Sequence, residues 1–379
     1  MKPSFLAARE LSFARGRFAL MGAVVALISV LMVLLSGLSE GLVNDGVSGL
    51  KRLDVTSMAF QADVQESSAY SRSTVGPDAV TAWQKQPGVA EATPFGNTLV
   101  NGRTNNGVEV DLALFGVELH SFLDPSVAEG QPLSGNDQIV ISPTAVEAGV
   151  KLGDTVTLEP SGLALKVVGV LGSQSTFGHV DVGYISLHSW QDAKAGVRSG
   201  DTVAPRVYQE FTSVAVKADK GASVDLAAGD KAAHTTSMTL KKSFGASPGF
   251  TAETSTLTLI QAFLYAISAL VVGAFFTVLT IQRKGEIAVL RALGASTGYV
   301  LRDSLLQSFA LLLASTAIGI GIGVGLGALL STTPMPFALA AGPVLAAAIL
   351  LIVLGMLGAA AAVVRITRVD PLTALGGSR

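Results

Sequence analysis

The chain has 379 residues, of which 49% are hydrophobic and only 14% are charged. Soluble domains carry about 25% charged residues, so this composition predicts a membrane protein. The formal net charge of −2 says little about partners, and the absence of cysteine excludes disulfides, thiolate metal sites and a cysteine nucleophile.

Four apolar stretches are each long enough to cross a bilayer, because a spanning helix needs about 20 apolar residues. They cover Phe18–Ser39, Leu257–Ile281, Ser304–Leu330 and Ala341–Val364, and none contains Asp, Glu, Lys, Arg or His. The first stretch is longer than the apolar core of a secretory signal, and no small-residue cleavage site follows it. We therefore expect the first stretch to be a retained helix.

Positive charge near the helix ends predicts the orientation of the chain. Residues 1–17, 282–303 and 365–379 together hold 11 of the 26 Lys and Arg residues, whereas the loop 331–340 has no charged residue. We therefore expect a multi-pass membrane protein with both termini and the 282–303 segment in the cytoplasm. Residues 40–256 are then extracellular.

The segment 40–256 is long enough for one or two folded domains. Six short runs rich in Val, Ile and Leu predict strands: "DLALFGVE", "QIVISP", "TVTLEP", "LALKVVGVLG", "VGYISL" and "TSVAVKA". Pro77 and Pro143 mark helix starts, and polar stretches near 66–76 and 97–107 predict exposed loops. The predicted fold is an α-helical membrane protein with four transmembrane helices plus an extracellular α+β domain between the first and second spans.

Catalytic and nucleotide-binding motifs are missing from the sequence. The four histidines are scattered without metal-ligand spacing, no G-x-S-x-G elbow surrounds Ser142 or Ser175, and there is no G-x-x-x-x-G-K-[ST] phosphate loop. We expect no enzymatic activity and no intrinsic cofactor, so any ATP must be hydrolysed by a separate partner chain.

The cytoplasmic loop between the second and third spans combines charge with apolar periodicity. Val289, Leu290 and Leu293 fall within about a 100° arc of a helical wheel, while Lys284 and Arg291 point away from it. Such a helix either docks in a groove of a cytoplasmic partner or lies on the lipid headgroups.

Glycines recur every four residues in the third span, at Gly319, Gly323 and Gly327. A face of small residues permits close contact between membrane helices. We expect this face to pack against another helix of the same protomer, and a gating hinge is the alternative.

Several stretches resemble the MacB/FtsX-type permeases of ATP-binding cassette transporters. "RKGEIAVLRALGAS" resembles their coupling segment, and "RVDPLTALG" resembles their C-terminal ending. "LAARELSFARGRFALMGAVVALIS" resembles their N-terminal amphipathic helix, here residues 1–17, running into the first span. "SGNDQIVISPTAVEAGVKLGDTVTL" followed by "LKVVGVL" is similar to their external core domain, so the resemblance covers the whole chain.

The resemblance implies a homodimeric permease bound to two ATPase subunits, in which ATP-driven closing of the ATPases moves the spans and the ectodomains. The residues that would contact the ATPase are Glu286, Ile287, Leu290, Arg291, Leu293 and Gly294. Within the family the chain is most similar to the haem-exporting members, which implies haem as the substrate. The alternatives are a permease that regulates an external cell-wall enzyme and a lipoprotein or peptide extractor. Membrane lipid is a further expected partner, and nucleic acid is not.

Haem export requires groups that hold haem, and without cysteine the available iron ligands are His, Met, Tyr and carboxylates. Glu40 is the first candidate, because a carboxylate at the outer edge of a span is costly unless it is used or hydrated; its alternative role is to mark the water boundary. Met335 and Tyr265 follow, with an interfacial contact and helix packing as their alternatives. Met58 and His179 are the candidates in the ectodomain.

Overall fold

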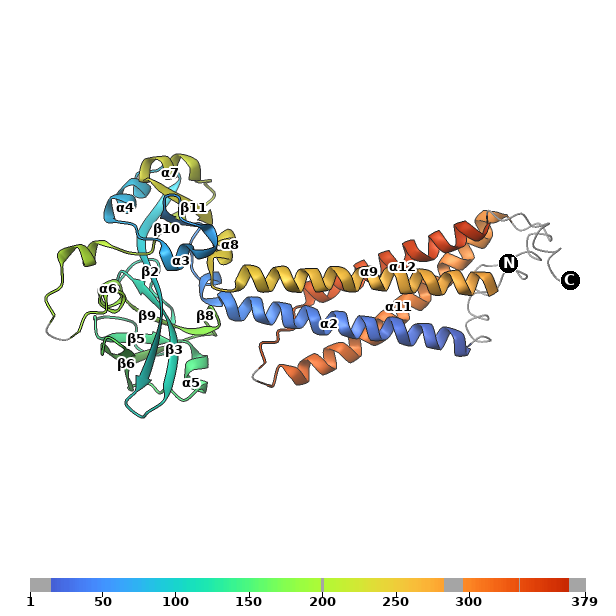
Figure 1. The fold of residues 1–379 in the computed structure, drawn as a ribbon, viewed down its shortest axis with the longest axis horizontal. Helices are drawn as coiled ribbons and strands as arrows, with labels where there is room; N and C mark the ends of the chain where they lie inside the picture. The colour runs from blue at the N-terminus through green and yellow to red at the C-terminus, as the bar shows by residue number, and fades with distance from the viewer. Residues whose placement is uncertain (1–14, 199–200, 283–295, 334, 368–379) are drawn as a thin grey trace. The chain divides into compact units, whose positions relative to one another are not determined.

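The computed structural model describes residues 15–198, 201–282, 296–333 and 335–367. The chain forms two compact units, one of residues Met1–Leu42 with Ser255–Arg379 and the other of residues Val43–Thr254. The first unit holds long apolar helices, and the second holds the strands (Figure 1). The predicted combination of four membrane helices with an α+β domain between the first and second spans is confirmed.

Four of the described helices are long and apolar enough to cross a membrane. They are α2 (Arg15–Lys51), α9 (Phe250–Gln282), α11 (Thr297–Leu330) and α12 (Ala341–Thr367). Their shared core contains Met21 and Val25 of α2, Phe276 of α9, Leu312 of α11 and Leu351 of α12. Each helix contains one of the predicted spans.

The first span belongs to a longer helix than its apolar stretch predicts. α2 continues past Ser39 to Lys51, with a kink at Val47, where φ is −147° and ψ is 16°. Residues 40–51 contain no proline, so the helix continues beyond the apolar stretch, and the kink at Val47 follows Gly46. Glu40 therefore lies inside a helix and not at its end.

The second and third spans also begin earlier than predicted, at Phe250 and at Thr297. The side chain of Ser296 caps α11 by accepting a hydrogen bond from the Tyr299 backbone N–H at 3.2 Å. Residues 297–303 therefore form the first turns of α11. The expected amphipathic helix of residues 1–17, the core of the coupling segment and the tail beyond Thr367 lie almost entirely outside the described residues.

The glycine face of α11 packs closely against α2. A Cβ atom on Gly319 would lie 2.5 Å from the Ser29 Cβ, and one on Gly323 would lie 2.8 Å from the Val33 Cβ. A Cβ on Gly321, by contrast, would meet no described heavy atom within 4 Å. The predicted packing role of this face is confirmed.

The second unit is built on an 11-stranded mixed sheet. Its strands are β1 (Ser57–Gln61), β2 (Val89–Thr104), β3 (Glu109–Val117), β4 (Val127–Gly130), β5 (Gln138–Ile141), β6 (Thr155–Glu159), β7 (Ala164–Leu171), β8 (Thr176–Phe177), β9 (Val180–Ser186), β10 (Ser213–Ala218) and β11 (Thr235–Thr239). The order is β11-β1-β10-β2-β3-β9-β5-β7-β4, with β6 beside β2 and β7, and β8 beside β9. The pairs β3–β9 and β5–β7 are parallel. All six predicted strands are confirmed, as β3, β5, β6, β7, β9 and β10.

The expected exposed loop at 97–107 is wrong for residues 97–104, which form the second half of β2. β2 pairs with β3 from Phe95 to Arg103 and with β6 from Asn101 to Thr104. Its Asn97 side chain is only 3% exposed. Pairing and burial override the weak strand preference of Gly and Asn here, because strand preference depends strongly on tertiary context.

Short helices cover the sheet. They are α3 (Ala69–Arg72), α4 (Pro77–Gln84), α5 (Pro143–Glu147), α6 (Leu187–Ala195), α7 (Leu226–Ala233) and α8 (Leu240–Ser243), with the 3₁₀ turns η1 (Glu66–Ser68), η2 (Pro205–Gln209) and η3 (Phe244–Ala246). The two helices predicted to start at proline are confirmed as α4 and α5.

Side chains of β3 enter two separate cores in alternation. Leu112 and Leu114 join a core that contains Trp83 and Trp190, whereas Phe115 joins a core of edge-to-face aromatic rings. Successive strand residues point to opposite faces, so the sheet is buried on both faces.

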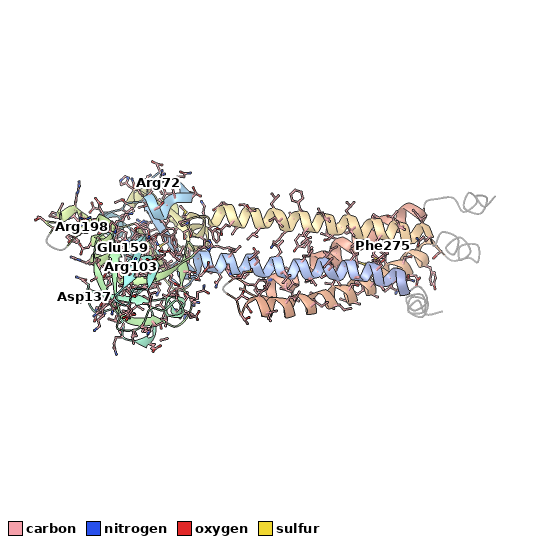
Figure 2. All side chains as sticks on the ribbon, turned by 60° about the horizontal axis from the view of Figure 1, so that its bottom comes forward. Arg72, Arg103, Asp137, Glu159, Arg198 and Phe275 are labelled. Carbon is pink, nitrogen blue, oxygen red and sulfur yellow. The ribbon has the colours of Figure 1, made fainter. Side chains whose placement is uncertain are left out.

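The sheet unit carries many charged side chains. The labelled residues Arg72, Arg103, Asp137, Glu159 and Arg198 all belong to it, whereas the labelled Phe275 belongs to α9 (Figure 2). Arg103 pairs with Glu109 at 2.5 Å and lies 3.9 Å from Glu159. This contrast in polarity suits a water-exposed domain joined to lipid-exposed helices.

Candidate functional site

An apolar groove of about 540 Å³ lies in the helical unit between α2 and α9. It is lined by Leu31, Leu34, Leu35 and Leu38 of α2, by Ile260, Phe263, Leu264 and Ile267 of α9, and by Leu330, Met335 and Phe337. All of these side chains are apolar, so the groove suits an apolar molecule.

Met335 reaches this groove from the loop between α11 and α12. Its side chain is 49% exposed. The loop is held against α2, because the Ala338 N–H donates to the Gly37 carbonyl at 3.0 Å and a Cβ on Gly41 would overlap the Pro336 carbonyl. The structure therefore places the Met335 loop beside the turn of α2 that carries Glu40.

Two of the sequence-predicted haem candidates do not line the groove. Glu40 is partly buried on α2, two residues beyond the groove residue Leu38. Tyr265 is partly buried against the apolar core of the bundle. The first sits close to the groove along the chain, and the second occupies a packing position.

Met58 lies in the aromatic core of the sheet unit and has no exposed surface. The Ser213 hydroxyl approaches its sulfur at 3.9 Å. In this conformation Met58 has no surface on which to meet a ligand.

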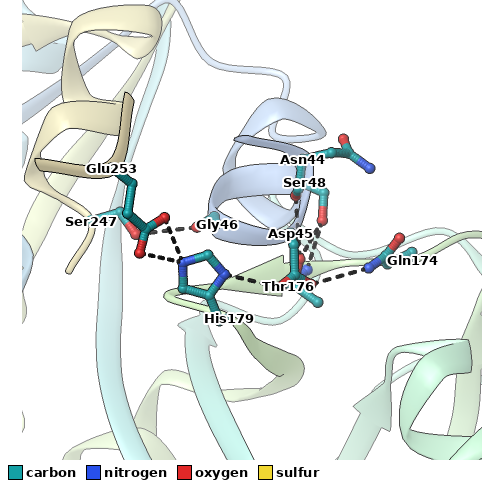
Figure 3. A network of polar contacts seen from close by, with 9 residues as sticks. All are labelled: Asn44, Asp45, Gly46, Ser48, Gln174, Thr176, His179, Ser247 and Glu253. Carbon is teal, nitrogen blue, oxygen red and sulfur yellow. Dashed lines mark hydrogen bonds and ion pairs between the residues drawn. The ribbon is translucent and has the colours of Figure 1, made fainter. Parts of the chain in front are cut away.

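His179, in the turn between β8 and β9, lies between two carboxylates of the sheet unit (Figure 3). Its Nδ1 is 2.9 Å from an Asp45 carboxylate oxygen, and its Nε2 is 3.1 Å from a Glu253 carboxylate oxygen. Burial lowers the pKa of His179, but the hydrogen bonds and negative charges of Asp45 and Glu253 outweigh burial, so its pKa is raised. Both ring nitrogens are therefore engaged, which makes His179 a bridge between α2 and α9.

Further hydrogen bonds surround this bridge (Figure 3). The Thr176 N–H donates to the Ser48 hydroxyl at 2.9 Å, and the Ser247 hydroxyl donates to the Gly46 carbonyl at 3.1 Å. Sequence reasoning selected His179 but missed its partners Asp45 and Glu253, because no local pattern connects residues so far apart in the chain.

Neither the expected ATPase contacts nor a metal site appears in the described structure. Glu286, Ile287, Leu290, Arg291, Leu293 and Gly294 lie in the interval 283–295, outside the described residues, and their role stays a prediction. Among the residues that are described, no group of three or more His, Asp or Glu side chains is arranged to hold a metal ion.

A bundle of four candidate membrane helices, with a mixed-sheet domain inserted after the first, defines a polytopic membrane protein of the permease class. The family profile for the MacB-like periplasmic core domain matches residues 3–230, and that for the FtsX-like permease C-terminal region matches residues 258–371. The chain belongs to the MacB/FtsX-like family of ABC transporter permeases, and it is a transport component of such a system.

Similar proteins cover the chain from end to end. HrtB of Staphylococcus epidermidis, named as a hemin transport system permease protein, is 24% identical over 380 residues, which is 99% of each chain. An uncharacterized ABC transporter permease of Mycobacterium tuberculosis is 25% identical over 389 residues, covering 98% of this chain and 99% of that protein.

Two solved structures of isolated domains are also similar. The extracellular domain of YknZ from Gram-positive bacteria is 15% identical with a TM-score of 0.34, covering 48% of this chain and 98% of that chain. The periplasmic region of MacB from Actinobacillus actinomycetemcomitans is 16% identical with a TM-score of 0.36, covering 50% of this chain and 90% of that chain.

Proposed function

We propose that this chain is the permease of an ATP-driven exporter. The exporter removes haem from the membrane and so protects the cell from its toxicity. The observation that carries the proposal is the wholly apolar groove between α2 and α9, in a chain that aligns over its full length with a protein named for hemin transport. The permease works as a homodimer with two copies of a cytoplasmic ABC ATPase, and both of its termini are cytoplasmic.

The groove supplies what a haem macrocycle requires. Haem in the membrane is already out of water, so the groove would hold it by close packing and by ligation of its iron, with no hydrophobic gain. Met335 lines the groove and offers a thioether, and Glu40, which lies on the next turn of α2 outside the lining, offers a carboxylate. Both groups are chemically suited to ligate haem iron. Tyr265 and His179 act structurally, by packing and by bridging carboxylates.

Transport requires the groove to change shape during the ATPase cycle. α2 and α9 line the groove, and each continues in sequence into the sheet domain. A displacement of either helix, driven from the cytoplasmic side, alters the width of the groove and expels its content. This scheme uses motion transmitted through the helices, and it needs no nucleotide site on this chain.

The proposal is tested by adding haem to the purified complex of this chain with its ATPase and recording the absorption spectrum. We expect a shifted haem band in the unaltered complex. Met335→Leu and Glu40→Gln are expected to weaken haem binding by roughly tenfold each, the loss that follows from about 1.4 kcal/mol of ligation energy. Met356→Leu, in the core of the bundle, and Glu129→Gln, on the sheet domain, are the matched controls.

Spectra of both variants identical to that of the unaltered complex would remove Met335 and Glu40 as ligands. If haem does not change the ATPase activity of the complex but a cell-wall hydrolase does, the regulatory function is supported instead. If a lipoprotein changes that activity, the extractor function is supported.

A further inference from the structure

A second cavity, of about 620 Å³, lies wholly within the sheet domain. Its walls come from residues 51–54 after the kink of α2, from loops around residues 122–126 and 171–175, and from Tyr184 of β9. It shares no lining residue with the groove of the helical unit.

Tyr184 lines this cavity and carries a hydroxyl group. The side chain is only 4% exposed, and its ring packs edge-to-face against Phe115 with the centroids 5.5 Å apart. None of the described residues forms a hydrogen bond with its hydroxyl. The hydroxyl is therefore available to a ligand that accepts a hydrogen bond.

Arg52 supplies a cation at the same cavity. Its Nε donates to the Gln174 carbonyl at 2.9 Å, which orients the guanidinium, and no described carboxylate forms an ion pair with it. Burial raises the pKa of Tyr184 and the nearby Arg52 charge lowers it, with the net effect a raised pKa. The tyrosine hydroxyl therefore stays protonated at physiological pH and acts as a donor beside the guanidinium.

The acidic residues at the cavity already have partners. Asp54 pairs with the Lys217 ammonium at 2.7 Å, and Asp124 accepts a hydrogen bond from the His120 N–H at 2.6 Å. Their charges are thereby partly offset. The donors of Arg52 and Tyr184 remain available to an incoming acid group.

The lining of the cavity is mixed, and apolar side chains form part of its wall. Phe122, Leu123 and Leu171 line it, and the Lys217 ammonium lies 5.4 Å from the centre of the Phe122 ring. A cation over the face of an aromatic ring is attracted to it and helps to hold the ring in place. The cavity thus combines a polar end that donates hydrogen bonds with an apolar wall.

We propose that this cavity binds a small amphipathic carboxylate, with the acid group on Arg52 and Tyr184 and the apolar body against Phe122 and Leu171. A guanidinium binds a carboxylate through two parallel hydrogen bonds, which gives both strength and orientation. The acid group belongs either to a tetrapyrrole or to a free fatty acid. The inference goes beyond the proposed export function, since it does not require haem to be the exported molecule.

The test uses the full-length chain in lipid nanodiscs and metal-free protoporphyrin IX, detected by its fluorescence. This porphyrin keeps the acid groups and lacks iron, so iron ligands contribute nothing to its binding. We expect Arg52→Gln to weaken binding roughly tenfold and Tyr184→Phe about threefold, in line with the loss of charged and neutral hydrogen bonds respectively. Arg72→Gln and Tyr208→Phe, exposed residues of the same domain, are expected to bind like the unaltered chain.

Two further binding measurements distinguish a tetrapyrrole from a fatty acid as the ligand. The dimethyl ester of protoporphyrin is expected to bind at least tenfold more weakly, because it lacks the ionised acid. Competition by palmitate supports the carboxylate site and assigns a fatty acid as one source, and tight porphyrin binding without such competition supports a tetrapyrrole source.

Equal binding of the ester and the acid, or unaltered affinity in both the Arg52 and Tyr184 variants, overturns the inference. Variants with an unchanged melting temperature exclude misfolding as the cause of lost binding, and Arg52→Lys, which keeps the charge, is expected to recover part of the affinity. The export proposal is judged separately, because Met335→Leu is expected to leave porphyrin binding in this cavity intact.

Discussion

Among the residues of the sheet domain, His179 contacts side chains from two elements that are far apart in the chain. Its Nδ1 contacts the carboxylate of Asp45 on α2, and its Nε2 contacts the carboxylate of Glu253 on α9. On its own hairpin, Asp181 has a carboxyl pKa raised by burial, and that carboxyl also lies within the field of Asp45. The histidine is thus surrounded by acidic groups, and its protonated form is the form that they stabilise.

The stability of the sheet domain should therefore depend on pH through His179. Because the folded-state pKa of His179 is raised, its contribution to stability is fully present below the unfolded-state pKa of about 6.5 and is lost as pH rises through the folded-state value. We expect the melting temperature to fall over this interval, modestly, because partly exposed pairs contribute about 0.2–1 kcal/mol. Tryptophan fluorescence measures it, since Trp83 and Trp190 are the two tryptophans of the chain and both lie in this domain.

In the variant His179→Gln, this part of the pH dependence should disappear. His234→Asn is the control, because His234 has a φ of 52° at the end of α7, a conformation that asparagine tolerates. A His179→Gln chain that keeps the full pH dependence of the unaltered chain would show that other groups cause it.

At the scale of elements, the contact between α2 and α11 illustrates how a small-residue pattern is used. Gly319 and Gly323 face Ser29 and Val33 of α2, whereas Gly321 faces open space. The repeat of four was visible in the sequence, and it predicted a packing face. Its partner helix was not visible, because any of the other spans offered a suitable apolar surface.

Gly319→Ala should destabilise the helical bundle by about 1–3 kcal/mol, since the added methyl group has no room between α11 and α2. Gly321→Ala is expected to be neutral or slightly stabilising, because alanine favours a helix over glycine by roughly 1 kcal/mol where nothing collides. Denaturation in SDS followed by circular dichroism measures the difference. Equal stability of the two variants would contradict the close packing of α2 and α11.

Some strands of the sheet domain can be predicted from the sequence, and others form only through tertiary contacts. β3, β5, β6, β7, β9 and β10 follow from local runs of branched apolar residues. The second half of β2, with its Asn and Gly residues, becomes a strand only because β3 and β6 pair with it. Similarly, the apolar stretch of the first span predicts a helix but not its end, since α2 persists through polar residues to Lys51.

At the scale of the whole molecule, family membership implies a separate ATPase partner. The predicted contact is the amphipathic segment that contains Leu290, which lies outside the described residues. This contact therefore rests on the helical wheel of the sequence and on the family resemblance alone.

Leu290→Asp is expected to abolish co-purification of the ATPase with the permease, because a charge placed in an apolar interface must be desolvated. Ala288→Asp adds the same charge on the opposite side of the helical wheel, and we expect it to leave the complex intact. Affinity purification from membranes, with both chains detected, measures the outcome. An intact complex in the Leu290 variant would favour an interfacial helix that rests on lipid headgroups.

The sequence by itself determined the class of this protein, because membrane spans, charge placement and family motifs are local properties of composition and spacing. It also offered Met335 as a haem-ligand candidate after Glu40, and that role stays a prediction. Only the tertiary structure decided which residues meet: the apolar groove between α2 and α9, the Asp45–His179–Glu253 bridge, and the cavity that Arg52 shares with Tyr184. These sites join residues separated by more than a hundred positions, and no short-range pattern encodes a contact that exists only once the chain has folded.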